Sequence, residues 1–296
     1  MTLSEQELNR RHANVVSKTA VGEKASTRFI STALKLIFLL ISAFLVFAPL
    51  VVMLSSAFKT EGELYEFPLR IIPREPTFGN FAQLAKNFPL YTWNSIKLTI
   101  IIVLAQLFTA TTGAYAFSKL RWKGRDLVFL LYVVSIMIPL QSIIIPQFLI
   151  IRNLGLYDTH LALILTGAFT AFGTFLIKQY FMTIPNSYSE AAYIDGANDF
   201  IIFLRVILPL AKPVFATQII FAFRFFWNDF FGPLIYITSE HLKTLPLGMS
   251  DFATEQYVYR GPQMAASLIS IIPVMIIFLA AQKYFVEGVA ATGVKG

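Results

Sequence analysis

The chain of 296 residues contains no cysteine and few charged side chains. Without cysteine it can form no disulfide, no iron–sulfur cluster and no cysteine-ligated zinc site. Charged residues make up 14% of the sequence and hydrophobic residues 56%, whereas a soluble domain carries about 25% charged residues. This composition excludes a soluble enzyme, a disordered chain and a nucleic-acid-binding domain.

Carboxylates are especially scarce. The 17 Asp and Glu residues are placed so that long stretches of sequence contain none of them. A carboxylate is costly in hydrocarbon, so these acid-free stretches are where membrane spans can lie. They cover residues 76–125, 127–157, 159–189, 200–228 and 256–286.

Several segments are apolar and long enough to cross a bilayer, which takes about 20 residues. Because backbone groups in lipid must hydrogen-bond internally, the spans should be helices. The sequence therefore predicts an all-α polytopic membrane protein with six transmembrane helices, in which an N-terminal tail over 1–31 precedes one six-span domain over 32–296. The predicted spans are residues 33–54, 93–117, 127–150, 161–182, 206–230 and 264–286.

Basic residues in the short loops predict the orientation of the chain. The loop 118–126 carries Lys119, Arg121, Lys123 and Arg125, whereas the loop 151–160 carries one basic residue, Arg152. Short loops rich in Lys and Arg stay in the cytoplasm. We therefore expect the N- and C-termini and the loops 118–126 and 183–205 to be cytoplasmic, and the longer loops 55–92 and 231–263 to face outward.

The sequence contains no motif that would couple transport to an ion gradient or to ATP hydrolysis. The predicted spans contain no Asp or Glu except Asp229, and the three histidines lie in tails or loops. This argues against proton-driven transport and, less strongly, against sodium coupling. The sequence has no G-x-x-x-x-G-K-[ST] phosphate loop, no metal-binding motif and no set of catalytic side chains. If transport is driven by ATP, another chain must bind the nucleotide.

Prolines and polar side chains interrupt the spans, as in a transport pathway lined by bent helices. Ordinary kinking explains the prolines equally well. The basic side chains could instead extend to the membrane surface, and the amides could join helices to one another. The candidate pathway residues are Lys97, Gln106, Gln141, Gln218, Arg224 and Asn228.

The loop 183–205 has the pattern of two short helices separated by a glycine. Ser187 or Ser189 can cap the first helix, Gly196 permits a turn, and a second helix can start near Asn198. A loop that merely joined two spans would not need these helices. A helix lying on lipid is the alternative, but the segment is not basic, which argues against it.

The residues of this loop resemble the EAA loop of permease subunits in bacterial ABC importers. The matching residues are Glu190-Ala191-Ala192, Asp195-Gly196-Ala197 and Leu208-Pro209. Other pairs resemble the carbohydrate-uptake branch, and within it the smaller six-span permease of maltose-type transporters. These are Asn94-Ser95, Met137-x-Pro139, Gly155-Leu156, Trp227-Asn228, Pro233-Leu234, Thr244-Leu245, Gly248-Met249 and the terminal Gly293-Val294-Lys295-Gly296.

The resemblance implies a type I ABC permease fold in the bacterial inner membrane and a role for three segments. Glu190, Ala191, Ala192, Asp195 and Gly196 would form the coupling helix that docks on an ATPase subunit. Gly293, Val294, Lys295 and Gly296 would reach towards the ATPase dimer. Gln256, Tyr257, Val258, Tyr259 and Arg260 would contact a solute-binding protein.

The resemblance also implies the partners and the cargo. The partners would be a homologous second permease, two ATPase subunits that hold ATP and magnesium, and an extracytoplasmic binding protein. The cargo would be an oligosaccharide, and the basic residues in the outer halves of the spans favour an acidic one of the alginate type. An ion-coupled secondary sugar transporter and a structural or sensory membrane protein are the alternatives.

Overall fold

The computed structural model describes residues 31–252 and 259–293, and within these ranges every regular element is a helix. The predicted all-α fold class is therefore confirmed. The first helix is Ser31–Ala57. The longer elements that follow are α4 (Phe88–Ser118), α5 (Arg125–Val134), α6 (Leu140–Asn153), α7 (His160–Gly167), α8 (Ala171–Thr183), α9 (Ser187–Ile194), α12 (Lys212–Trp227) and α15 (Arg260–Gly293).

Short elements connect these helices. They are α2 (Glu61–Leu64), α3 (Gly79–Leu84), η1 (Ser135–Met137), α10 (Asp199–Ile202), η2 (Phe203–Ile207), α11 (Leu208–Leu210), α13 (Phe231–Tyr236), η3 (Glu240–Leu242), α14 (Leu245–Met249) and η4 (Ser250–Phe252).

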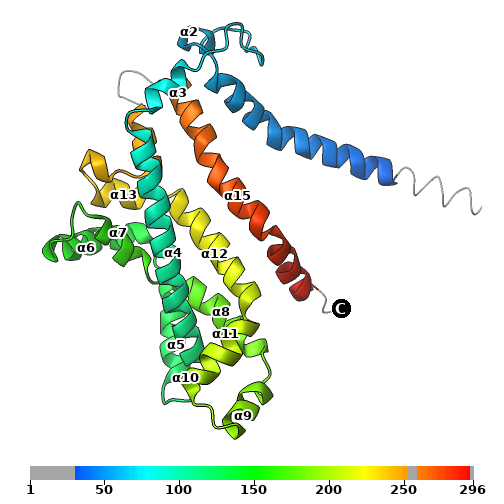
Figure 1. Ribbon diagram of the computed structural model, residues 1–296, viewed down its shortest axis with the longest axis vertical. Coiled ribbons are helices and arrows are strands. Elements are labelled where there is room, and N and C mark those ends of the chain that lie inside the picture. The colour runs from blue at the N-terminus through cyan, green and yellow to red at the C-terminus, as the bar shows by residue number, and fades with distance from the viewer. Residues whose placement is uncertain (1–30, 253–258, 294–296) are drawn as a thin grey trace, which may run out of the picture.

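Helix α4 runs along most of the molecule, and α8 and α12 pack against it (Figure 1). Helix α15 packs against α12 on the other side. Helix α9 lies at one end of the molecule and α3 at the opposite end, so we call these the α9 end and the α3 end (Figure 1). The helix Ser31–Ala57 stands away from the others over most of its length, where most of its apolar side chains are exposed, whereas Ala57 at its end is buried.

Four described helices are long and apolar enough to cross a membrane, and the number reaches six if each of two bent pairs is one span. The four are Ser31–Ala57, Phe88–Ser118, His160–Thr183 and Arg260–Ala280. The bent pairs are Arg125–Met137 with Leu140–Asn153, at 103°, and Asp199–Leu210 with Lys212–Trp227, at 76°. These bends correspond to the predicted spans 127–150 and 206–230.

The two bends are far larger than the kinks that the sequence predicts. Pro139 stands immediately before α6 in an extended conformation and has no N–H to continue the preceding helix. The second break falls at Ala211, two residues before Pro213. Each proline therefore starts a new helix in a new direction instead of bending a continuous one.

Small side chains let α4 and α8 approach closely. Ala110 and Ala114 of α4 are fully buried, and a Cβ on Gly113 would lie 3.4 Å from Cγ2 of Thr174 on α8. Such close packing of small residues is typical of helices that associate within a membrane. It fixes the two helices as one unit through the centre of the protein.

At the α3 end, α14 packs closely on the start of α4. A Cβ on Gly248 would lie 2.2 Å from Cδ2 of Tyr91, whose side chain is buried. We expect Gly248→Ala to lower the free energy of unfolding by about 1–3 kcal/mol, because the ring must move to admit the methyl group. The unfolding midpoint of the purified protein in detergent measures this. Gly62→Ala is the control, since nothing lies within 4 Å of its Cβ position; equal midpoints for the two variants would contradict the prediction.

Candidate substrate cavity and coupling helix

A cavity of about 1190 Å³ lies among α4, α6, α7, α12 and α13. Its wall is mainly apolar and aromatic, with a few polar groups, which is the usual composition of a ligand site. Five of the six candidate pathway residues line it: Gln106, Gln141, Gln218, Arg224 and Asn228. Lys97 is not among the lining residues, although it lies on α4 near lining residues Ser95 and Thr99.

The cavity also contains polar residues that the sequence analysis missed. Gln147 lies on α6 beyond Pro146, and its position inside a predicted span was a signal that could have identified it. Tyr236 and Thr244 come from the segment that follows α12. That segment was interpreted as an outward loop, so its side chains were not expected to line the pathway.

Helix α4 supports a break between α7 and α8 beside the cavity. Gln106 Nε2 donates a hydrogen bond of 2.8 Å to the carbonyl of Gly167, and Thr109 Oγ1 donates one of 2.7 Å to the carbonyl of Ala168. Thr170 then caps α8 by accepting a bond from the N–H of Gly173. Broken helices are stable at membrane depth only when the freed backbone groups find such partners.

Arg224 and Asp229 are the charged residues of the cavity wall. Among the described residues, no carboxylate lies within ion-pair distance of Arg224. The Asp229 carboxylate instead accepts a hydrogen bond of 3.1 Å from the N–H of Gly232, so α13 holds it in place. Asn228 donates a bond of 2.8 Å to the Arg224 carbonyl at the end of α12. The Arg224 guanidinium is exposed and available to a ligand.

Helix α9 projects from the α9 end of the molecule (Figure 1). Neither predicted serine caps it, since Asn186 occupies the N-cap position. The helix ends at Ile194, Gly196 follows with φ at 82°, and the N–H of Ala197 bonds to the carbonyl of Ala192. These are the features of a Schellman motif, and they confirm the predicted turn.

The predicted coupling residues lie together on this projection. Glu190, Ala191, Asp195 and Gly196 are exposed, and Ala192 packs against the buried cluster between α4 and α8. Neighbouring apolar side chains are also exposed, with Ile194 at 87% and Phe200 at 67%. The projection therefore has the shape and apolar surface of a docking element.

Tyr115 on α4 and Lys119, which directly follows this helix, hold the projection in place. Lys119 Nζ donates hydrogen bonds to the carbonyl of Ile184 at 2.7 Å and to Oδ1 of Asn186 at 3.1 Å. Burial lowers the pKa of the Lys119 ammonium group. Tyr115 donates a bond of 3.0 Å to the carbonyl of Asp199, on the helix after α9. From the sequence, Lys119 is expected only to help orient the chain in the membrane.

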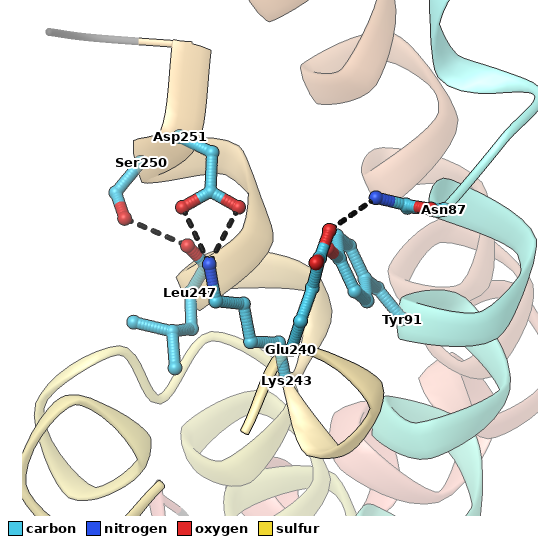
Figure 2. A network of polar contacts seen from close by, with 7 residues as sticks. All are labelled: Asn87, Tyr91, Glu240, Lys243, Leu247, Ser250 and Asp251. Carbon is cyan, nitrogen blue, oxygen red and sulfur yellow. Dashed lines mark hydrogen bonds and ion pairs between the residues drawn. The ribbon is translucent and has the colours of Figure 1, made fainter. Parts of the chain in front are cut away.

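At the α3 end, the segment after α13 is fixed to the start of α4 by polar contacts (Figure 2). Glu240 accepts hydrogen bonds from Asn87 and Tyr91, and Lys243 forms an ion pair of 2.8 Å with Asp251. Figure 2 shows these groups on either side of one short helical turn. This network fixes the position of the segment that carries Thr244.

Asp158 fixes the same segment from another direction. Its carboxylate accepts hydrogen bonds from the hydroxyl of Ser239 and from the backbone N–H groups of Ser239 and Thr238. These bonds, that of the Ser239 side chain first, hold the pKa of the Asp158 carboxyl below its usual value.

The structure describes the two other predicted contact regions in part. Arg260 begins α15, and its guanidinium lies 4.9 Å from the ring centroid of Tyr65. Tyr259 precedes it and is exposed, while Gln256, Tyr257 and Val258 lie outside the described residues. At the C-terminus Gly293 ends α15, and Val294, Lys295 and Gly296 lie outside the described residues. Within the described ranges, no three His, Asp or Glu side chains are grouped to hold a metal ion.

Comparison with known proteins identifies the family. Residues 107–290 match the model of the binding-protein-dependent transport system inner membrane component. The chain is 32% identical over 269 residues to the arabinooligosaccharides transport system permease protein AraQ of Bacillus subtilis (strain 168), covering 89% of this chain and 95% of AraQ.

Two solved structures share the fold. One belongs to a bacterial ABC transporter involved in the import of the acidic polysaccharide alginate, with a TM-score of 0.78, 28% identity, and coverage of 86% of this chain and 96% of that chain. The other belongs to a bacterial alginate ABC transporter in complex with an alginate pentasaccharide-bound periplasmic protein. Its TM-score is 0.64 at 16% identity, with coverage of 83% of this chain and 91% of that chain.

Lys119 provides a test of how α9 is held. We expect Lys119→Met to speed hydrogen exchange of the amides in 187–197 roughly tenfold, because two hydrogen bonds to the start of the projection are lost. Mass spectrometry of the purified protein measures the exchange. Lys123→Met, at an exposed position of the same loop, is the matched control and should leave these amides unchanged. Unchanged exchange in Lys119→Met would contradict the prediction.

Proposed function

Since the chain belongs to the family of binding-protein-dependent transport system inner membrane components, we propose that it is the permease subunit of an ATP-driven oligosaccharide importer. Its cavity would pass the sugar, and separate subunits would hydrolyse ATP. The observation that carries this proposal is that α4 joins the cavity wall to the helix that projects from the α9 end. Movement of the projection would therefore move the cavity wall.

The exposed surfaces support an assembly of several chains. The most apolar stretch of the helix Ser31–Ala57 contains no buried residue, and several leucines of α5 are exposed. Lipid and a second, homologous permease would cover these surfaces. Two ATPase subunits would bind the α9 projections of the two permeases. The alginate transporter of known structure was crystallised with its periplasmic protein, and we propose a similar extracytoplasmic partner here.

The transport cycle would be a two-state transition that nucleotide and ligand bias. ATP binding would draw the ATPase subunits together and move the α9 projections with them. Lys119 and Tyr115 would transmit this motion to α4, whose Gln106 supports the broken helix beside the cavity. The cavity would then open to the binding protein.

The proposed orientation places the α9 end and both termini in the cytoplasm. Four basic residues in the loop 118–126, which lies at this end, support the assignment. Residues 293–296 would then lie on the side of the ATPase subunits. Residues 256–260 would face the binding protein at the α3 end, where the described Arg260 begins α15.

We propose that the cargo is an acidic oligosaccharide of the alginate type. AraQ takes part in transport of arabinooligosaccharides, and the 28%-identical structure belongs to an importer of the acidic polysaccharide alginate. The cavity favours the acidic class because Arg224 is exposed in its wall without a carboxylate partner among the described residues. Arginine binds carboxylates in a bidentate geometry.

An ion-coupled secondary transporter is the alternative. Such a protein would need a carboxylate free to bind a coupling ion, and Asp229 is instead hydrogen-bonded by α13. Uptake that continues after ATP depletion and stops when the ion gradient collapses would favour this alternative.

Glu190 tests the coupling role of α9. We expect Glu190→Lys to abolish uptake and transport-coupled ATPase activity, because reversal of the charge on the exposed face would oppose docking. The subunit should still insert in the membrane, since Glu190 is exposed. Activity is measured in proteoliposomes with the partner subunits, and Glu66→Lys at the other end serves as the control. Normal coupled activity in Glu190→Lys would refute the coupling role.

Arg224 tests the charge of the cargo. We expect Arg224→Gln to reduce uptake of a uronate oligosaccharide at least tenfold more than uptake of a neutral one, because a charge-assisted hydrogen bond is lost. Lys97→Gln removes a cation from the same region but outside the cavity lining, so it should affect the two sugars equally. Competition between the two sugars in one uptake assay measures the ratio. An unchanged ratio in Arg224→Gln would exclude charge recognition.

A further inference from the structure

Three buried polar side-chain atoms of the cavity wall have no hydrogen-bond partner among the described residues. They are Oε1 of Gln218, the hydroxyl of Tyr236 and the hydroxyl of Thr244. The exposed fractions of these residues are 3%, 2% and 6%. A buried polar group without a partner costs free energy, so such groups mark places where something else supplies the missing bond. Three of them in one cavity point to a ligand.

The orientation of the Gln218 amide follows from its neighbours. Gln106 Nε2 donates to the carbonyl of Gly167, which leaves Gln106 Oε1 as an acceptor. Gln218 Nε2 points to this oxygen at 3.4 Å. A Cβ on Gly173 would lie 2.6 Å from Gln218 Nε2, so α8 closes the space on that side. The Gln218 oxygen is therefore left as an acceptor for a donor that enters the cavity.

The other two groups are hydroxyls held at fixed positions. The Tyr236 ring stacks on Phe148, with centroids 6.5 Å apart. Thr244 is the N-cap residue of α14, but its side chain makes no capping bond. The second position of that helix is Pro246, which has no N–H group to donate a hydrogen bond to the Thr244 hydroxyl. Both hydroxyls are thus free to bond to a ligand.

The three groups are spread along the cavity. Thr244 lies beside Ser95, since the next residue, Leu245, donates its N–H to Ser95 Oγ at 2.7 Å. Gln218 lies beside Gln106. Residues 95 and 106 of α4 are separated by about 16 Å along the helix axis, at about 1.5 Å per residue. A single sugar ring is too short to reach both ends of this distance, whereas an extended oligosaccharide can.

We propose that Gln218, Tyr236 and Thr244 form a hydroxyl-binding track for an oligosaccharide of two or more units. The proposal rests on the proposed function and adds that this subunit itself recognises the cargo, through its hydroxyl groups and its length. Gln218 accepts a bond from a sugar hydroxyl near the middle of α12. Tyr236 and Thr244 bind hydroxyls nearer the α3 end, and Arg224 contacts a carboxylate where the sugar carries one.

The experiment uses the complete transporter with its binding protein in proteoliposomes. The probes are a uronate pentasaccharide, a neutral pentasaccharide and the two corresponding monosaccharides. Tyr236→Phe and Thr244→Val each remove one hydroxyl that has no partner among the described residues, and Gln218→Met removes the amide. Thr111→Val is the matched control, because the Thr111 hydroxyl is also buried without a partner but does not line the cavity.

We expect each cavity variant to reduce pentasaccharide uptake about fivefold, through loss of one hydrogen bond. Uptake of any monosaccharide should change less, and Thr111→Val should match the wild type. The unfolding midpoints of Tyr236→Phe and Thr244→Val should stay at the wild-type value or rise above it, since the buried hydroxyls bond to nothing among the described residues. A merely structural role would lower these midpoints.

Three outcomes would overturn the track. Wild-type pentasaccharide uptake in all three cavity variants would show that water alone satisfies these groups, and the importer function would still stand. Equal losses for pentasaccharide and monosaccharide would refute recognition of length. A wild-type complex with no ATP-dependent uptake of any probe would instead refute the proposed function, and the track with it.

Discussion

Helix α4 supplies the hydrogen-bond donors that let irregular backbone exist beside it. Gln106 and Thr109 satisfy the break between α7 and α8, and Lys119 satisfies the end of α8. At the other end, Asn94 donates to the carbonyls of His241 and Lys243. In hydrocarbon no water can take over these bonds. The cavity, the projecting α9 and the segment 231–252 therefore depend on one continuous helix.

This dependence gives the fold a mechanical consequence. The buried contacts of Ala110, Ala114 and Gly113 join α4 to α8, and α9 follows α8 directly. Close-packed elements transmit displacement instead of absorbing it. The helix Ser31–Ala57, which lies apart from the rest in Figure 1, is free of this constraint. A force on α9 would therefore reach the cavity wall before it reached the first helix.

The sequence predicted the helical class, because scarce carboxylates and apolar length are direct consequences of the membrane. The bounds of the six spans stay a prediction. The sequence did not predict the 103° and 76° bends, since a proline removes a donor but packing decides the angle. Lys97 and Arg224 were equivalent in sequence, and only the packing of α4 and α12 separated them. Gln106, a candidate pathway residue, lines the cavity, but its amide N–H bonds to a backbone carbonyl.

The polar residues of the cavity fall into two groups that composition alone cannot separate. Gln106 and Asp229 use their side chains to satisfy backbone groups, so their replacement would disturb the helices that form the wall. Within the described residues, Gln218, Tyr236 and Thr244 each present an atom without a hydrogen-bond partner, and Arg224 has no carboxylate partner. The side chains of the first set are hydrogen-bonded to backbone groups of the protein. The side chains of the second set can still form a hydrogen bond or ion pair with a ligand. A cavity that must bind an oligosaccharide and release it needs both a fixed frame and a small number of such groups.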